Sequence, residues 1–141
     1  MAFDLSKYKT QSTGKIQIEF DGEEIEGAAV ILHGQITKEY QDAVATFFSD
    51  LKKAELDLGL DKEQLESASY DLQTALLVAV TTEIQGVAIG DEIVGGNKAM
   101  IKQIYEEKGY LWLRGQVVTK IFSAKTFLAD PDPIKKSKKN S

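Results

Sequence analysis

The sequence predicts an α+β domain that is mainly helical, with an N-terminal β-hairpin packed on about four helices. Residues 15–32 alternate apolar and polar side chains around a turn signal, as half-buried strands do. Four stretches between residues 37 and 128 carry apolar side chains at steps of three and four, the period of an amphipathic helix. Hydrophobic residues make up 43% of the 141 residues, enough for one modest core.

The hairpin is predicted from two alternating segments, Lys15–Phe20 and Ile25–Leu32. Between them stands Asp21-Gly22, a dipeptide that favours the tight turns joining antiparallel strands. A lone hairpin is marginally stable in water, so this one must pack on helices or on another chain.

The first two helices are predicted from caps and apolar stripes. Thr37 can cap the first helix, which ends at Gly59. Asp61 and Gln64 resemble a capping box at the start of the second. The link between the helices is short, so they should lie antiparallel. Their apolar stripes contain Ala43, Val44, Phe47, Phe48, Leu51, Ala54 and Leu58, and then Leu65, Ala68, Leu72, Ala75, Leu76, Ala79 and Val80.

The stretch Gly86–Asn97 holds four of the eleven glycines. A phosphate-binding loop would need a lysine directly after its second glycine and then a hydroxyl residue. Here Lys98 comes late, and Asp91 and Glu92 would repel a phosphate. We therefore predict no bound cofactor and interpret the stretch as an extended connector between helices. Its apolar side chains Ile89, Ile93 and Val94 are expected to be held in the core.

Two further helices complete the predicted domain. Asn97 can cap the third, over residues 98–108, and the fourth should run over residues 110–128. Asp130-Pro131-Asp132-Pro133 then prevents further helix. We accordingly divide the chain into a flexible lead (1–14), a single globular domain (15–130) and a disordered lysine-rich tail (131–141).

Charge and composition exclude several functions. The last seven residues hold four lysines and no acid, so the rest of the chain has 13 of the 17 basic residues against 22 acidic residues, a net charge of −9. Such a body repels phosphate backbones, so no nucleic-acid partner is expected. The longest apolar run, Ala75–Val80, is much shorter than the roughly 20 residues of a membrane span, and no membrane partner is expected. The N-terminal residues lack the pattern of a signal peptide, and the chain has no cysteine, which suits the cytosol.

Catalytic and metal sites are not predicted. The single histidine, His33, has no evident nucleophile or acid partner, and the acidic clusters lack the spacing of a calcium loop. Tyr110, Leu111, Trp112 and Leu113 are four bulky residues in a row and cannot all face one core. They are interpreted either as core residues with partial cover or as a protein interface, where Trp and Tyr are favoured. The candidate interface residues are Phe47, Phe48, Tyr110 and Trp112.

The order of elements and the segment Ile84–Val94, with the sequence I-Q-G-V-A-I-G-D-E-I-V before a polar helix cap, resemble a known family. This family is the tail assembly chaperones of long-tailed bacteriophages. The resemblance covers residues 15–128 and lies in pattern more than in identity. Members of the family usually carry a tryptophan-like residue just before the glycine. This chain departs from that pattern, because Glu83, Ile84 and Gln85 precede Gly86.

The resemblance implies a protein that is not an enzyme and needs no cofactor. It would act in the host cytoplasm as a homo-oligomer and would keep the tape measure protein soluble during tail morphogenesis. The tail tube protein would be a further candidate partner. Two alternatives stay open: a small structural or adaptor protein of a phage tail or neck, and a small enzyme of unknown type.

Overall fold

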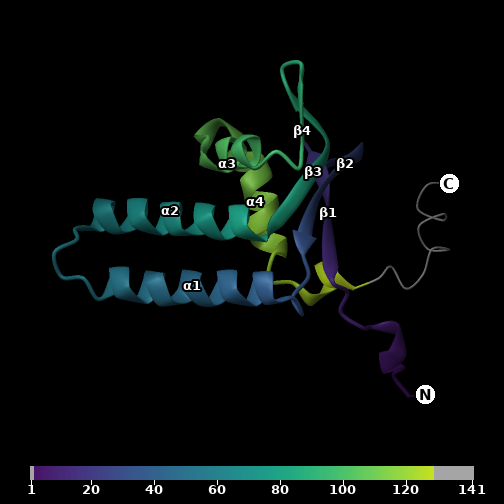
Figure 1. Cartoon of the computed structure of the whole chain (residues 1–141), viewed down its shortest axis with the longest axis horizontal. Coiled ribbons are helices and arrows are strands. Elements are labelled where there is room, and N and C mark those ends of the chain that lie inside the picture. Colours follow the sequence, from purple (N-terminus) through teal and green to yellow (C-terminus); the bar gives the residue numbers. More distant parts are fainter. Residues whose placement is uncertain (1, 129–141) are drawn as a thin grey trace.

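The computed structural model describes residues 2–128 of the chain. Within that range a four-stranded antiparallel sheet in the order β1-β2-β3-β4 is combined with four α-helices (Figure 1). The elements are β1 (Thr13–Phe20), β2 (Glu23–His33), α1 (Lys38–Glu55), α2 (Lys62–Val80), β3 (Thr81–Ile89), β4 (Glu92–Gly95), α3 (Lys98–Glu106) and α4 (Leu111–Lys120).

The predicted N-terminal hairpin is present. Asp21 and Gly22 form its turn with φ angles of 55° and 82°, the positive values that a two-residue hairpin turn of this kind requires. Ile16 lies opposite Val30 in the register of β1 and β2, and both side chains are buried. The alternation of apolar side chains therefore places one face of this hairpin in the core.

The predicted fold class is nevertheless wrong, because the hairpin is not alone. β3 pairs with β2 through Val30 and Ile84, and β4 pairs with β3 through Ala88 and Ile93. The strands of the N-terminal hairpin thus form half of a larger sheet and are not a separate layer on a helical body. The prediction failed because the end of α2 and the first half of β3 form one run with almost no charged residues. Without charged residues, the spacing of apolar side chains does not show where the helix ends and the strand begins.

The interpretation of Gly86–Asn97 as a connector is likewise wrong. This stretch contains the second half of β3, the turn at Gly90, β4 and the cap of α3. Val94 is buried as predicted and Ile89 is half-buried, whereas Ile93 is 78% exposed. Figure 1 shows the reason, since β3 and β4 extend beyond the rest of the sheet as a projecting arm.

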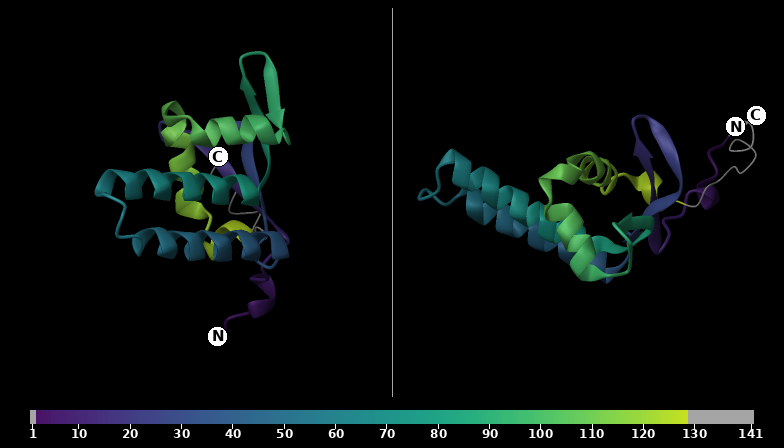
Figure 2. Two further views of the ribbon diagram at one scale, coloured as in Figure 1. Left: turned by 60° about the vertical axis from the view of Figure 1, so that its left-hand side comes forward. Right: turned by 90° about the horizontal axis from the view of Figure 1, so that it is seen from above.

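α1 and α2 form an antiparallel pair that projects from the sheet (Figures 1 and 2). Thr37 caps α1, accepting a hydrogen bond from the backbone nitrogen of Tyr40 at 3.2 Å. In α2 the Asp61 side chain accepts from the Gln64 nitrogen at 2.8 Å, and the Gln64 side chain accepts from the Asp61 nitrogen at 2.9 Å. Both predicted caps are therefore confirmed.

The capping box gives a first testable expectation. We expect Asp61→Ala to lower the free energy of unfolding by about 1 kcal/mol, because it removes an acceptor from the first turn of α2. Urea denaturation followed by circular dichroism measures the change. Lys62→Ala is the matched control, since Lys62 is the exposed neighbour in the same turn. Equal denaturation midpoints for the two variants would show that the box contributes nothing.

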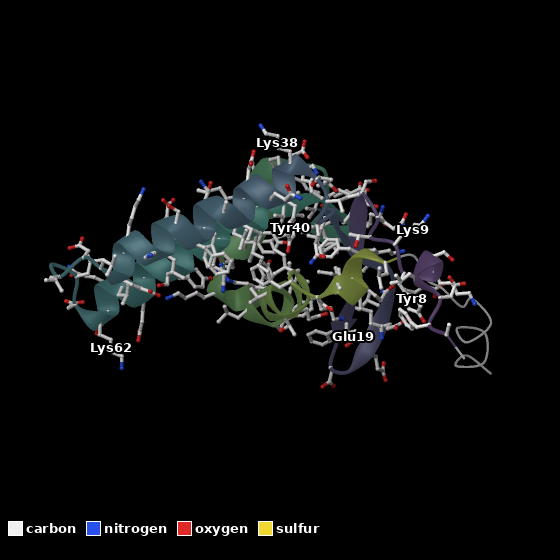
Figure 3. All side chains as sticks on the ribbon, turned by 90° about the horizontal axis from the view of Figure 1, so that it is seen from below. Tyr8, Lys9, Glu19, Lys38, Tyr40 and Lys62 are labelled. Carbon is white, nitrogen blue, oxygen red and sulfur yellow. The ribbon has the colours of Figure 1, made fainter. Side chains whose placement is uncertain are left out.

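The last predicted helix ends earlier than expected. α4 stops at Lys120, and the chain turns through a short 3-10 helix, Ala124–Phe127, so that Leu128 forms an isolated bridge with Thr10. Phe127 is fully buried and makes an edge-to-face contact with Tyr40, with ring centroids 5.5 Å apart. Figure 3 shows Tyr40 pointing inward from α1, whereas Lys38 and Lys62 point away from the helices. Residues 10–14 thus lie against the C-terminal end of the domain, and the predicted tail falls outside the described residues.

A buried arginine of α4 makes hydrogen bonds to both α2 and α3. Arg114, the single arginine of the chain, is only 3% exposed. From α4 it donates to the carbonyl oxygens of Tyr70 at 2.9 Å and Tyr105 at 2.6 Å, and to the side chains of Gln73 and Thr74. Its guanidinium also lies 3.7 Å from the centre of the Tyr70 ring. Desolvation lowers the pKa of Arg114, and these neutral acceptors compensate for the loss of water.

Candidate protein-binding faces

The exposed side of α2 is bordered by two open grooves. One groove lies between α1 and α2 and has a volume of about 440 Å³, and the other lies between α2 and α3 and has a volume of about 1100 Å³. Both include Ala75 and Ala79, which are exposed, so the grooves meet along this line of small side chains. We call this surface the groove face.

The groove face is apolar in its floor and acidic at its rims. The floor of the α1–α2 groove is formed by Ala43, Phe47, Leu72, Ala75, Leu76 and Ala79. Its polar lining is Glu39, Asp42, Thr46 and Asp50, with no lysine or arginine. The α2–α3 groove is lined by Glu63, Glu66, Asp71 and Glu106 together with Lys102 and Lys108. The ammonium nitrogen of Lys102 lies 3.6 Å from a carboxylate oxygen of Glu106. One of the two lysines that line this groove is therefore already paired with an acid of the groove.

This arrangement suits one kind of ligand. An amphipathic helix laid in a groove buries its apolar side chains on the floor and leaves its polar side chains at the rims. Rims that carry seven carboxylates and two lysines attract positive side chains. The groove face is therefore complementary to an apolar helix flanked by lysine or arginine.

A second apolar surface lies on α4. Phe122, just after α4, is 6.0 Å from Phe48 of α1, and Trp112 makes an edge-to-face contact with Phe20 of β1, with ring centroids 5.0 Å apart. These four aromatic side chains are 42–56% exposed. The exposed α4 residues between the two pairs, Gly115 and Thr119, are uncharged, as is the exposed Leu111 beside Trp112. We call this surface the aromatic face.

The four interface residues predicted from the sequence fall at different places. Phe48 and Trp112 lie on the aromatic face, and Phe47 is half-buried in the floor of the α1–α2 groove. Tyr110 is half-buried and packs against the core. The sequence did not single out Phe20 or Phe122. Phe20 continues the apolar alternation of Ile16 and Ile18, and Phe122 lies one turn after Val118, so the sequence pattern favours an inward position for both.

The two apolar faces lie on different flanks of the α1–α2 pair. Residues of a helix advance by about 100° each, so Phe48 and Thr46 point to opposite flanks of α1. Phe48 contacts Phe122, whereas Thr46 lines the groove. In the view from above in Figure 2, α4 lies beside the helical pair, whereas α3 crosses over it. Both faces can therefore be occupied at once.

Lys98, the lysine considered for a phosphate site, is engaged elsewhere. Its ammonium group donates to the carbonyl oxygen of Val78 at 3.3 Å and to that of Thr81, at the C-terminal end of α2. A cation at this position is favoured by the negative end of the helix dipole. Burial lowers the pKa of Lys98. The residue thus acts as a side-chain cap that fixes the junction between α2 and β3.

Buried polar chemistry within residues 2–128 is structural. Thr74, Thr81 and Arg114 are the buried polar residues of this range, and all three make hydrogen bonds inside the fold. The Thr81 hydroxyl lies 2.8 Å from that of Tyr105, and burial raises the pKa of Tyr105 to about 12. Over the same residues no three histidine, aspartate or glutamate side chains form a group that could hold a metal ion.

Searches of known protein families, of curated protein sequences and of solved structures found no match to this chain. In the part of the chain that the structure describes, no helix combines the length and apolarity needed to cross a membrane.

Proposed function

We propose that this protein is a tail assembly chaperone of a long-tailed bacteriophage. It oligomerises and binds the tape measure protein, keeping that protein soluble in the host cytoplasm while the tail is assembled. The groove face is the observation that supports this proposal most directly, since it offers an apolar floor to a helical client. No chemical step is required of the protein.

Binding would follow from burial and charge together. A tape measure protein is long and helical, and its apolar stripes aggregate when they are left exposed to water. Each stripe laid over Ala75 and Ala79 would lose its contact with water, a gain of about 25 cal/mol per Å² of apolar surface. Several copies of the chaperone along one client would bind by avidity, so each groove needs only a modest affinity.

The proposal is tested by co-expression with the tape measure protein encoded by the same phage. We expect the wild-type chain to keep that protein in the supernatant after lysis. Ala75→Lys should abolish most of this effect, because the lysine fills the floor where the grooves meet and repels a basic client. The readout is the fraction of tape measure protein that remains soluble and co-purifies with the chain.

Ala45→Lys is the matched control, because Ala45 is an exposed helical alanine of α1 that lies outside both grooves. It should solubilise the client as well as the wild type does. If the wild-type chain leaves the tape measure protein as insoluble as it is alone, the proposed function is wrong. Recovery of the chain from purified virions would instead favour a structural tail or neck protein.

A further inference from the structure

We propose that the aromatic face is covered by a second copy of this chain, with the two α4 helices antiparallel about a two-fold axis. The inference assigns a surface to the self-association contained in the proposed function and in that respect rests on it. Its test needs no tape measure protein. Dimerisation and client binding can therefore fail independently of each other.

The area of the aromatic face suits such a contact. Phe20, Phe48, Trp112 and Phe122 are each about half exposed, and together they leave on the order of 400 Å² of apolar surface open to water. The largest apolar patch of a typical monomer covers roughly 300–600 Å² and is often functional. A standard interface buries about 800 Å² on each partner, and its rim is polar. This face can supply the apolar centre of such an interface.

Gly115 allows two helices to approach closely at the middle of this face. A Cβ atom added to Gly115 would have no neighbour within 4 Å, so open space lies above the helix there. Glycine lowers the stability of a helix interior by about 1 kcal/mol relative to alanine, and nothing inside the described fold requires it at this position. Packing of a second helix against the bare backbone provides a physical reason for it.

Charge at the two ends of the aromatic face selects the antiparallel arrangement. At the end next to Trp112, the turn after Phe20 carries the exposed acids Asp21, Glu23 and Glu24. The other end carries Lys120 and Lys125. In an antiparallel pair the acidic end of each copy lies over the basic end of the other, whereas a parallel pair would bring like charges together. The middle of the face is uncharged and matches itself across a two-fold axis.

The contact at Trp112 is held rigidly. Gln116, one turn further along α4, accepts from the Glu19 backbone nitrogen at 2.8 Å and donates to the Glu19 oxygen at 2.7 Å. These two bonds replace a neighbouring strand at the outer edge of β1 and fix α4 beside Phe20. The aromatic face is thereby pre-organised, which lowers the entropic cost of association.

Trp112 is the only tryptophan, so its fluorescence reports on this face in the unmodified chain. We expect sedimentation equilibrium to show a monomer–dimer equilibrium, with Trp112 emission shifting to shorter wavelength as the dimer forms. Gly115→Gln should weaken the dimer about tenfold or more, because the new side chain separates the helices. At concentrations low enough for both chains to be monomeric, its thermal midpoint should equal or exceed that of the wild type, since the helix gains a better helix former. Ala75→Gln, an exposed position on the groove face, should leave dimerisation unchanged.

The antiparallel order has its own test. A copy with Glu23→Lys and Glu24→Lys, and another with Lys120→Glu and Lys125→Glu, should each dimerise more weakly than the wild type. Mixed together they should form a heterodimer, because charges then match at both ends. The proposal is overturned by a chain that stays monomeric at high concentration, or by a dimer that tolerates Gly115→Gln with Trp112 emission unchanged. A shift of Trp112 emission that occurs only on adding the tape measure protein would assign the face to the client and also overturn it.

Discussion

Arg114→Leu is expected to lower the free energy of unfolding by about 3 kcal/mol or more. The substitution removes the charged donor from the backbone oxygens of Tyr70 and Tyr105, which keep only the hydroxyl groups of Thr74 and Tyr70 as side-chain donors. It also removes the guanidinium hydrogen bonds to the side chains of Gln73 and Thr74. Each hydrogen bond from a charged donor contributes about 1.5–3 kcal/mol to stability. Stacking on the Tyr70 ring is lost as well. Guanidinium denaturation monitored by circular dichroism measures the change.

Two variants separate the geometry of the guanidinium from its charge. Arg114→Lys keeps the charge, but one ammonium group cannot span acceptors on both α2 and α3, so most of the loss should remain. Lys125→Leu removes an exposed cation near the end of the domain and should change stability by less than about 0.5 kcal/mol. A lysine variant as stable as the wild type would show that charge alone matters at this position.

Local signals in the sequence were sufficient for the first hairpin and for the helix starts. Asp21-Gly22 specifies a turn by its own conformational preference, and Thr37, Asp61 and Asn97 satisfy backbone donors only a few residues away. Such features depend on neighbours in the chain. They are therefore visible in the sequence without knowledge of the fold.

Features that depend on distant residues were missed. β3 is a strand because Ile84 pairs with Val30 across the sheet. Glycines with positive φ interrupt the apolar pattern of β3 and β4, so the sequence does not indicate this second hairpin. α4 ends at Lys120 because Phe127 turns inward against Gly14, where an added Cβ would lie 2.5 Å from its ring. These contacts override the apolar period that favoured a longer helix.

The candidate faces were only partly predictable for the same reason. Counting bulky side chains identified Phe48 and Trp112 but could not separate them from the half-buried Phe47 and Tyr110. The groove face could not be anticipated at all, because it depends on how α1 and α3 lie against α2. One overlooked signal was available. Arg114 is the single arginine in a chain whose other cations are lysines, and it stands between the buried Leu113 and Val117. An arginine at such a position indicates that several hydrogen bonds from a planar guanidinium are needed, which a lysine ammonium cannot make.

Gly86→Ala is the backbone substitution expected to be most damaging in the glycine-rich segment. Gly86 has a φ of +68°, which costs an alanine about 1–2 kcal/mol. Its new Cβ would also lie 2.2 Å from the carbonyl oxygen of Gly27, a backbone atom of β2 that cannot rotate away. β2 and β3 would have to separate near Ala29 and Gln85, their last paired residues before the arm. We expect a total loss of about 3 kcal/mol or more, measured by thermal and urea denaturation.

Gly90→Ala is the control that isolates the steric part of this loss. Gly90 has nearly the same backbone conformation, with a φ of +60°, but an added Cβ would meet nothing within 4 Å. Only the conformational cost of about 1–2 kcal/mol should then appear. The difference between the two variants measures the close approach of Gly27 and Gly86, the point where the sheet divides into its two projecting hairpins. Equal losses would mean that β2 and β3 yield freely there, and that the direction of the β3–β4 arm is not set by this contact.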